Sequence, residues 1–299
     1  MFYALYTLNA LLMFVPPIVL GIIIARKRGI GWGVFWSGAL TFILSQVGHI
    51  PFNSIALPSL NTMFSGYSNN TALVGLALFL GVSSGVFEEV ARYLTYRFWR
   101  KDVRTWGGGM MLGAGHGGVE AFLVGISFAS TFLALTAYDA GMLPNLLASV
   151  PAEELSVAQA LVQSQIQAFH AIPWYGRFLG GIERLFAITL HLSLSLMVMQ
   201  CFTQKKHAWL VLAIAWHALS NAGAVIIIGL ETQLIPGLEN QYTAELFIGI
   251  IAIISLFIIF HFKQPEPVEP EPEPLPPLKK AELIEVDPTA ENLEGSRYV

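Results

Sequence analysis

Three stretches of the chain place pairs of polar side chains at helical spacing inside otherwise apolar segments. The pairs are Glu88 and Arg92 in "EEVAR", His116 and Glu120 in "GAGHGGVEA", and His217 and Asn221 in "HALSN". Residues four apart share one face of an α-helix. In "ERLFAITLHLS", Arg184 and His191 are seven apart, which again puts them on one face. Four helices therefore each present a polar face, and the sequence predicts that these faces surround one shared site.

A carboxylate with three histidines suits several kinds of chemistry. Charged side chains cost about 2.5–3.5 kcal/mol each at the bilayer centre, so they usually mark function there. One interpretation is general-base hydrolysis, in which a carboxylate takes a proton from water while imidazoles orient that water or stabilise an oxyanion. Another is a metal site, since His and carboxylate are zinc ligands, although the HExxH signature is absent and "HGGVE" reverses its order. A third is a proton or ion relay in a transporter.

The bulk composition indicates that these helices lie in a membrane. The chain has 299 residues, of which 55% are hydrophobic and only 12% charged, and its mean hydropathy is +0.61. A soluble domain carries about 25% charged residues. The net charge of −4 argues against a nucleic-acid partner, since no basic face could gather phosphates. The single cysteine, Cys201, excludes an intrachain disulfide and a cysteine-rich structural zinc site.

Seven apolar segments are long enough to span a bilayer, which takes about 20 residues each. They cover residues 2–25, 32–50, 72–98, 107–136, 177–202, 207–230 and 243–262. The first segment has no positively charged start and is too long for a secretory signal, so we interpret it as a membrane helix kinked at Pro16 and Pro17. The predicted fold class is an all-α, multi-pass helical bundle in the cell membrane.

The distribution of basic residues predicts the orientation of the bundle. Lys and Arg follow every second span, at Arg26, Lys27, Arg28, Arg97, Arg100, Lys101, Arg104, Lys205, Lys206 and Lys263. The alternate loops, at 51–71, 137–176 and 231–242, contain neither Lys nor Arg. Because basic loops stay in the cytoplasm, the N-terminus is predicted outside the cell and the C-terminus in the cytoplasm.

Four regions follow from this pattern. They are two N-terminal helices with an outer loop (1–71), a four-helix catalytic core (72–230) that includes the outer loop 137–176, a last membrane helix (231–262) and a cytoplasmic tail (263–299). The tail alternates Pro with Glu, which favours a disordered spacer.

The outer loop is predicted to contain an amphipathic helix over 152–172. Its apolar face would consist of Leu155, Ala158, Val162, Ile166 and Phe169. This face could rest on the outer leaflet or pack on the protein itself.

The four motifs, in order on successive apolar helices over about residues 72–230, resemble the YhfC family of membrane peptidases. That family is similar to the PrsW proteases and, more distantly, to the type II CAAX prenyl endopeptidases, which are glutamate-type intramembrane proteases. The resemblance implies that Glu88 is the general base and that His217 and Asn221 bind the water or the oxyanion. Glu120 matches a Glu of the PrsW proteins, and His116 is the alternative contact to the water on the same helix.

The remaining polar residues have plainer interpretations. Arg92 is included in the catalytic site as an ion-pair partner. Glu89 is either a functional member of that site, or an ion-pair partner of Arg92 or Arg184, or a solvated neighbour. His49 is interpreted as an interfacial histidine and Glu183 as a surface charge.

The predicted activity is an intramembrane endopeptidase that acts on membrane-embedded or membrane-associated proteins or peptides in the lipid bilayer. Neither a cofactor nor a metal ion is predicted. The alternatives are an ion or solute carrier, for which the sequence shows no internal repeat, and a catalytically inactive membrane scaffold.

Overall fold

The computed structural model of the chain describes residues 1–142, 147–234 and 242–263, and within these ranges all regular structure is helical. Seven of the described helices are long and apolar enough to cross a membrane, which confirms the predicted all-α multi-pass class. They are α1 (Phe2–Arg28), α2 (Trp32–Phe64), α3 (Asn69–Leu94), α4 (Trp106–Asp139), α7 (Leu179–Thr203), α8 (Ala208–Leu234) and α9 (Tyr242–His261). A short π-helix, η1 (Thr95–Trp99), continues α3. The predicted tail lies almost wholly outside the described residues.

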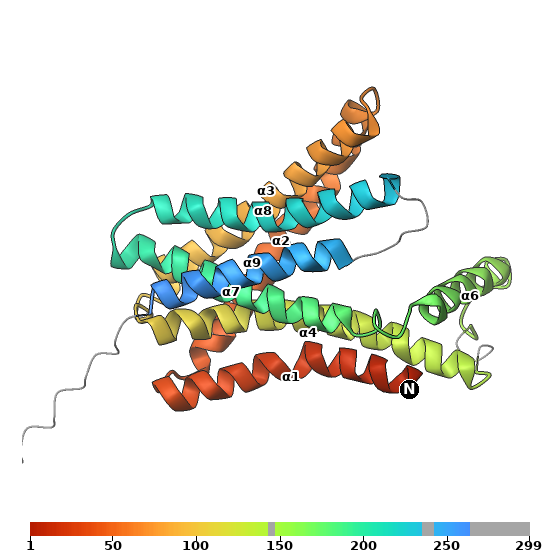
Figure 1. Cartoon of the computed structure of the whole chain (residues 1–299), viewed down its shortest axis with the longest axis horizontal. Coiled ribbons are helices and arrows are strands. Elements are labelled where there is room, and N and C mark those ends of the chain that lie inside the picture. The colour runs from red at the N-terminus through yellow and green to blue at the C-terminus, as the bar shows by residue number, and fades with distance from the viewer. Residues whose placement is uncertain (143–146, 235–241, 264–299) are drawn as a thin grey trace, which may run out of the picture. The chain divides into compact units, whose positions relative to one another are not determined.

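Helix α7 is the central element of the bundle. It packs against α1, α4, α8 and α9. Of the 18-residue stretch that makes α7 apolar enough to cross a membrane, 72% is buried inside the protein. Leu194, Leu196 and Val198 have no exposed surface. Figure 1 shows α7 between α4 and α9, with α3 and α8 on the other side of α9 in that view. A side chain on α7 can therefore meet groups from several helices at once.

Helix α2 is longer than the sequence predicted. It runs to Phe64 rather than ending near residue 50, and both Pro51 and Pro58 lie inside it. Its 33 residues correspond to about 50 Å at 1.5 Å per residue, against a hydrocarbon core of about 30 Å. Hydroxyl groups bond to backbone carbonyls beside each proline, Ser54 to Ile50 and Thr62 to Pro58.

The first half of α2 packs on α4, and its second half turns away with α3 (Figure 1). The close approach of α2 and α4 requires glycine. A Cβ on Gly115 would lie 1.8 Å from the carbonyl oxygen of Phe35, and one on Gly38 would lie 2.0 Å from that of Leu112. The glycines around His116 therefore let two backbones touch, as small residues do between membrane helices.

Helix α6 (Leu155–Ala171) coincides with the amphipathic segment predicted over 152–172. Ile166 is buried in a small cluster with Tyr6 and Leu135, and the Tyr6 hydroxyl donates to the carbonyl of Phe169 at 2.7 Å. The predicted apolar face thus packs on the protein itself, while Leu161 on another face is exposed. Following the predicted orientation, we call the side of the bundle that carries Met1 and the turn between α2 and α3 the outer side.

Candidate active site

Glu88 of α3 lies among three imidazoles from three other helices. Its Oε2 is 3.1 Å from Nε2 of His116 and 3.9 Å from Nε2 of His217. The ring of His191 lies between them, with its centroid 4.9 Å from that of His116 and 5.4 Å from that of His217. All four side chains are buried, and Glu88 is 5% exposed. The structure therefore brings together the polar faces of α3, α4, α7 and α8.

Glu89 faces a different set of partners from Glu88. It accepts a hydrogen bond from the Arg92 guanidinium, and its Oε1 lies 2.8 Å from Nδ1 of His217. Glu89 and Arg92 both have no exposed surface, so Glu89 is the ion-pair partner of Arg92 and not a solvated neighbour. A buried charge is tolerated only when it is paired and hydrogen-bonded, and this pair meets both conditions.

Both ring nitrogens of His191 are engaged. Nδ1 lies 3.2 Å from an Arg92 guanidinium nitrogen, which can only donate, so Nδ1 accepts. Nε2 then carries the proton and donates to Glu120 Oε2 at 2.5 Å. His191 is thus held in one neutral tautomer by a cation on one side and a carboxylate on the other.

Glu120 contacts His191 and not Glu88. Its Oε1 accepts from Arg184 at 2.8 Å, and Arg184 also donates to Glu183. Of the two alternatives on α4, it is therefore His116 that bonds to Glu88, while Glu120 belongs to a second layer that includes Arg184. Glu183, interpreted from the sequence as a surface charge, ends this ion-pair chain.

Two residues that the sequence analysis missed hold the other oxygen of Glu88. Oε1 accepts from Gln46 Nε2 at 3.2 Å and lies 3.3 Å from the Ser84 hydroxyl. Asn221 donates to that hydroxyl at 2.8 Å, so its contact with the site passes through Ser84. The signal for Ser84 was present, because it precedes Glu88 by four residues on one helix face. Gln46 lies 42 residues away along the chain, and no spacing rule links it to Glu88.

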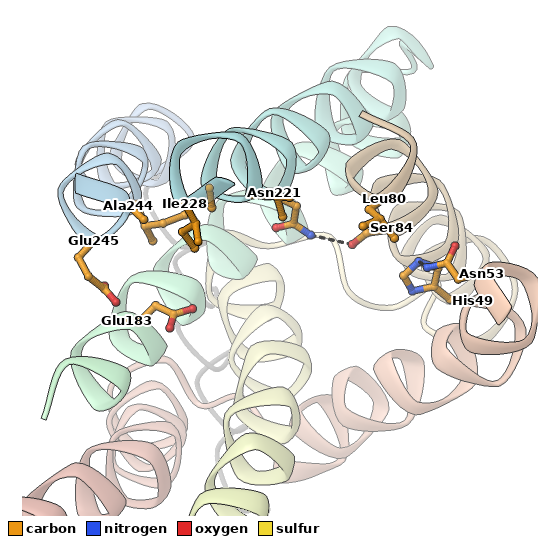
Figure 2. Close-up of a pocket in the computed structure, with 12 residues that line it drawn as sticks. His49, Asn53, Leu80, Ser84, Glu183, Asn221, Ile228, Ala244 and Glu245 are labelled. Atoms are coloured by element: carbon orange, nitrogen blue, oxygen red, sulfur yellow. Dashed lines mark hydrogen bonds between the residues drawn. The ribbon is translucent and has the colours of Figure 1, made fainter. Parts of the chain in front are cut away.

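A cavity of about 460 Å³ extends from Ser84 and Asn221 to Ile228 and Ala244 (Figure 2). The last two residues lie in the halves of α8 and α9 that are nearer the outer side (Figure 1). His49 and Asn53 of α2 line one wall, and Glu183 and Glu245 of α7 and α9 lie at the other side, as Figure 2 shows. His49, interpreted from the sequence as an interfacial histidine, lies on this wall and is hydrogen-bonded. Ser84 contacts both the cavity and Glu88, so the cavity ends one side chain away from the buried carboxylate.

The donor set fits a divalent metal by type and spacing. Glu88, His116 and His191 can each offer one ligand atom, and these atoms lie within 4.8 Å of one another. Two imidazoles and a carboxylate are a common zinc donor set. Nδ1 of His116 is buried and has no hydrogen-bond partner among the described residues, but the nitrogen of that ring that faces Glu88 is Nε2. In addition, His191 would have to release Arg92 or Glu120 before it could bind a cation.

Comparison with known proteins gives two findings. The family described as "YhfC intramembrane metalloprotease" matches residues 11–234. A Bacillus subtilis (strain 168) protein described as "Uncharacterized membrane protein YhfC" is 33% identical over 259 residues, which cover 86% of this chain and 95% of the relative. No solved structure matches. The matched range contains all the residues that meet around Glu88.

Proposed function

The chain belongs to the YhfC intramembrane metalloprotease family, and from that premise we propose that it is an endopeptidase that cleaves membrane-embedded or membrane-associated proteins. The observation that supports this is the buried Glu88 carboxylate, surrounded by three imidazoles and adjoining a cavity within the membrane-spanning helices. Buried ionisable residues at membrane depth are costly and usually functional.

Glu88 is proposed to accept a proton from the attacking water. Gln46 and Ser84 hold its Oε1 from the cavity side, while Oε2 faces His116 and His217. Held in this way, the carboxylate presents a fixed oxygen to a water molecule, which general-base catalysis requires. The same carboxyl group can then return the proton to the leaving amine.

His217 and Asn221 are proposed to orient the water and the developing oxyanion. Because His217 Nδ1 donates to Glu89, the neutral ring leaves its Nε2 lone pair on the side of Glu88. Protonation at Nε2 would be stabilised by the Glu89 carboxylate behind the ring. Asn221 uses one amide hydrogen toward Ser84 and has a second one to offer to an oxyanion at the cavity end.

The family's description adds a metal to this scheme. Glu88, His116 and His191 are the residues that would hold a divalent cation, which would supply Lewis-acid polarisation of the peptide carbonyl. Glu88 would then serve as a ligand instead of a free base. Because His191 already bonds through both ring nitrogens, we propose the version in which Glu88 acts as the base.

The test uses purified protein in liposomes with two probes, labelled casein and a panel of single-span membrane peptides. Cleavage products identified by mass spectrometry, which are lost in Glu88→Gln protein, are the expected result. Ion flux without cleavage would instead establish a carrier. The absence of both for the folded protein would favour the inactive scaffold.

A further inference from the structure

The cavity beside Glu88 has a polar wall at α2 and α3, and a mixture of apolar and acidic side chains from α7, α8 and α9. Its lining includes polar groups from α2, α3 and α8, namely His49, Asn53, Ser84 and Asn221. The apolar part of the lining comes from α8 and α9, namely Ala224, Val225, Ile228, Ala244 and Ile248, and Glu183 of α7 and Glu245 of α9 add two carboxylates beside it. A volume of about 460 Å³ is in the range of sites that enclose a ligand. A purely structural gap between membrane helices would not need the polar wall.

The polar wall on α2 is joined to Glu88 by hydrogen bonds. Gln46, His49 and Asn53 follow one another at helical spacing on one face. Gln46 Nε2 donates to Glu88 Oε1 at 3.2 Å, Gln46 Oε1 lies 3.3 Å from His49 Nδ1, and Asn53 Nδ2 lies 2.9 Å from His49 Nε2. Ser83 of α3 bonds to both His49 and Asn53. These contacts fix the amide and imidazole groups along the cavity.

A membrane-spanning substrate creates a need for such groups. In a helix, the peptide N–H and C=O groups bond to each other, so attack on one peptide bond requires that the helix unwind locally. In the bilayer an unwound backbone finds no water, and each unpaired polar group costs several kcal/mol. An amide side chain can both donate and accept, so Asn53 and Asn221 can pair with freed backbone groups on either side of the cavity.

We infer that this cavity is the substrate cleft and that it binds an unwound segment of a membrane-spanning protein, which it receives from the outer half of the bilayer. The inference rests on the proposed peptidase function and deepens it. Asn53 is a positioning residue that pairs with the substrate backbone, and His49 holds Asn53 in place. The preferred substrates are spans whose helix is broken in its outer half, for example by a Gly-Pro pair.

The first experiment asks whether water reaches the cavity from outside, and it needs no substrate. Cys201 is the single cysteine of the chain, so a Cys201→Ala protein accepts one new thiol at a chosen place. Leu80 lines the cavity, whereas Leu78, two residues away on α3, does not line it and is 51% exposed on the surface of a helix long and apolar enough to cross a membrane. Leu80→Cys should react with a membrane-impermeant charged maleimide added outside intact cells, at least about tenfold faster than Leu78→Cys. Equal rates, or reaction only from the cytoplasmic side in inverted vesicles, would overturn the inference.

The second experiment asks what the cavity binds. Leu80→Cys is combined with Glu88→Gln, so that a peptide is held without being cut. Two synthetic membrane-spanning peptides of about 20 apolar residues are compared, one with a Gly-Pro pair in its outer half and one with an unbroken helix. The peptide with the Gly-Pro pair should slow the maleimide labelling of the Leu80→Cys thiol. The peptide with the continuous helix should slow this labelling at least about tenfold less. Equal protection by both peptides, or protection by neither, would contradict the inference.

A substitution at Asn53 separates positioning from structure. Asn53→Leu keeps the approximate size but removes the amide, so the concentration of broken peptide that gives half-protection should rise about 3- to 10-fold, as expected for the loss of one or two hydrogen bonds. Asn53→Gln should recover part of this loss, and the unfolding temperature should stay within a few degrees of that of the parent. An unchanged half-protection concentration would refute the role of Asn53. Because protection is measured without cleavage, it can succeed even if Glu88 proves not to be the base.

Discussion

His217 Nδ1 lies 2.8 Å from Glu89 Oε1, with both side chains buried. The carboxylate fixes the tautomer and the orientation of the ring, as carboxylates do for functional histidines elsewhere. Glu88, the neighbour of Glu89 in the sequence, points about 100° away around the helix. Its Oε2 lies 3.9 Å from Nε2 of His217, the other ring nitrogen. The adjacent carboxylates therefore have different surroundings: Glu88 faces the cluster of imidazoles, where we propose the reaction takes place, and Glu89 orients one of these imidazoles.

We expect the stability of the protein to depend on Glu89 and Arg92 each having the other as its partner, and not on either charge by itself. Arg92→Met leaves Glu89 charged and buried without its cation, which costs about 3–5 kcal/mol when one partner of a buried pair is removed. The double variant Glu89→Leu with Arg92→Met removes both charges and should recover most of the lost stability. Thermal unfolding in detergent measures this. If the double variant loses as much stability as the Glu89→Leu and Arg92→Met variants lose together, the two residues do not act as a pair.

His217→Ala should slow cleavage by about 10²–10⁴-fold, because general acid–base and orienting groups contribute on that scale. The control is His207→Ala, since His207 is exposed, contacts the Tyr93 hydroxyl and makes no contact with Glu88. The measurement compares the initial cleavage rates of the two variants at equal amounts of protein. Equal rates for the two variants would remove His217 from the mechanism.

Gly115→Ala should destabilise the protein by at least about 1–3 kcal/mol, the usual cost of overpacking. The added Cβ would lie 1.8 Å from the Phe35 carbonyl oxygen and push α2 away from α4. Gly66→Ala is the matched control, because a Cβ there meets nothing within 4 Å. Comparison of the two unfolding temperatures tests the contact, and a Gly115→Ala protein as stable as the control would contradict it.

The sequence was sufficient for the class of fold and for most of the cluster. Seven apolar segments predicted the spans, and the four-residue spacing placed Glu88, His116 and His217 on inward faces. Spacing alone could not show which of Glu88 and Glu89 faces the cluster, because that depends on the rotation of α3 about its axis; the expectation for Glu88 came from the family resemblance.

Other features depend on contacts that are distant along the chain. Gln46 reaches Glu88 from another helix, and a single polar residue in an apolar segment gives no periodic signal. The length of α2 was missed because proline usually ends a helix, whereas Pro51 and Pro58 both lie inside α2.

Treatment with a chelator should leave the activity of purified protein unchanged, because in this account Glu88 acts as a base and both ring nitrogens of His191 are already bonded. The measurement is cleavage after EDTA or phenanthroline treatment, together with the zinc content of the protein. Loss of activity that added zinc restores would instead make Glu88, His116 and His191 ligands, and the general-base assignment would be wrong.

Glu88→Gln tests the central claim most directly. Glutamine keeps the size of the side chain and its contacts with Gln46 and Ser84 but cannot accept the proton of a water molecule. Cleavage of a substrate peptide by the purified variant should fall by at least about 10²–10⁴-fold, while its unfolding temperature stays close to that of the wild type. If Glu88→Gln protein cleaves the same peptide at the wild-type rate, Glu88 is not the catalytic base and the account is wrong.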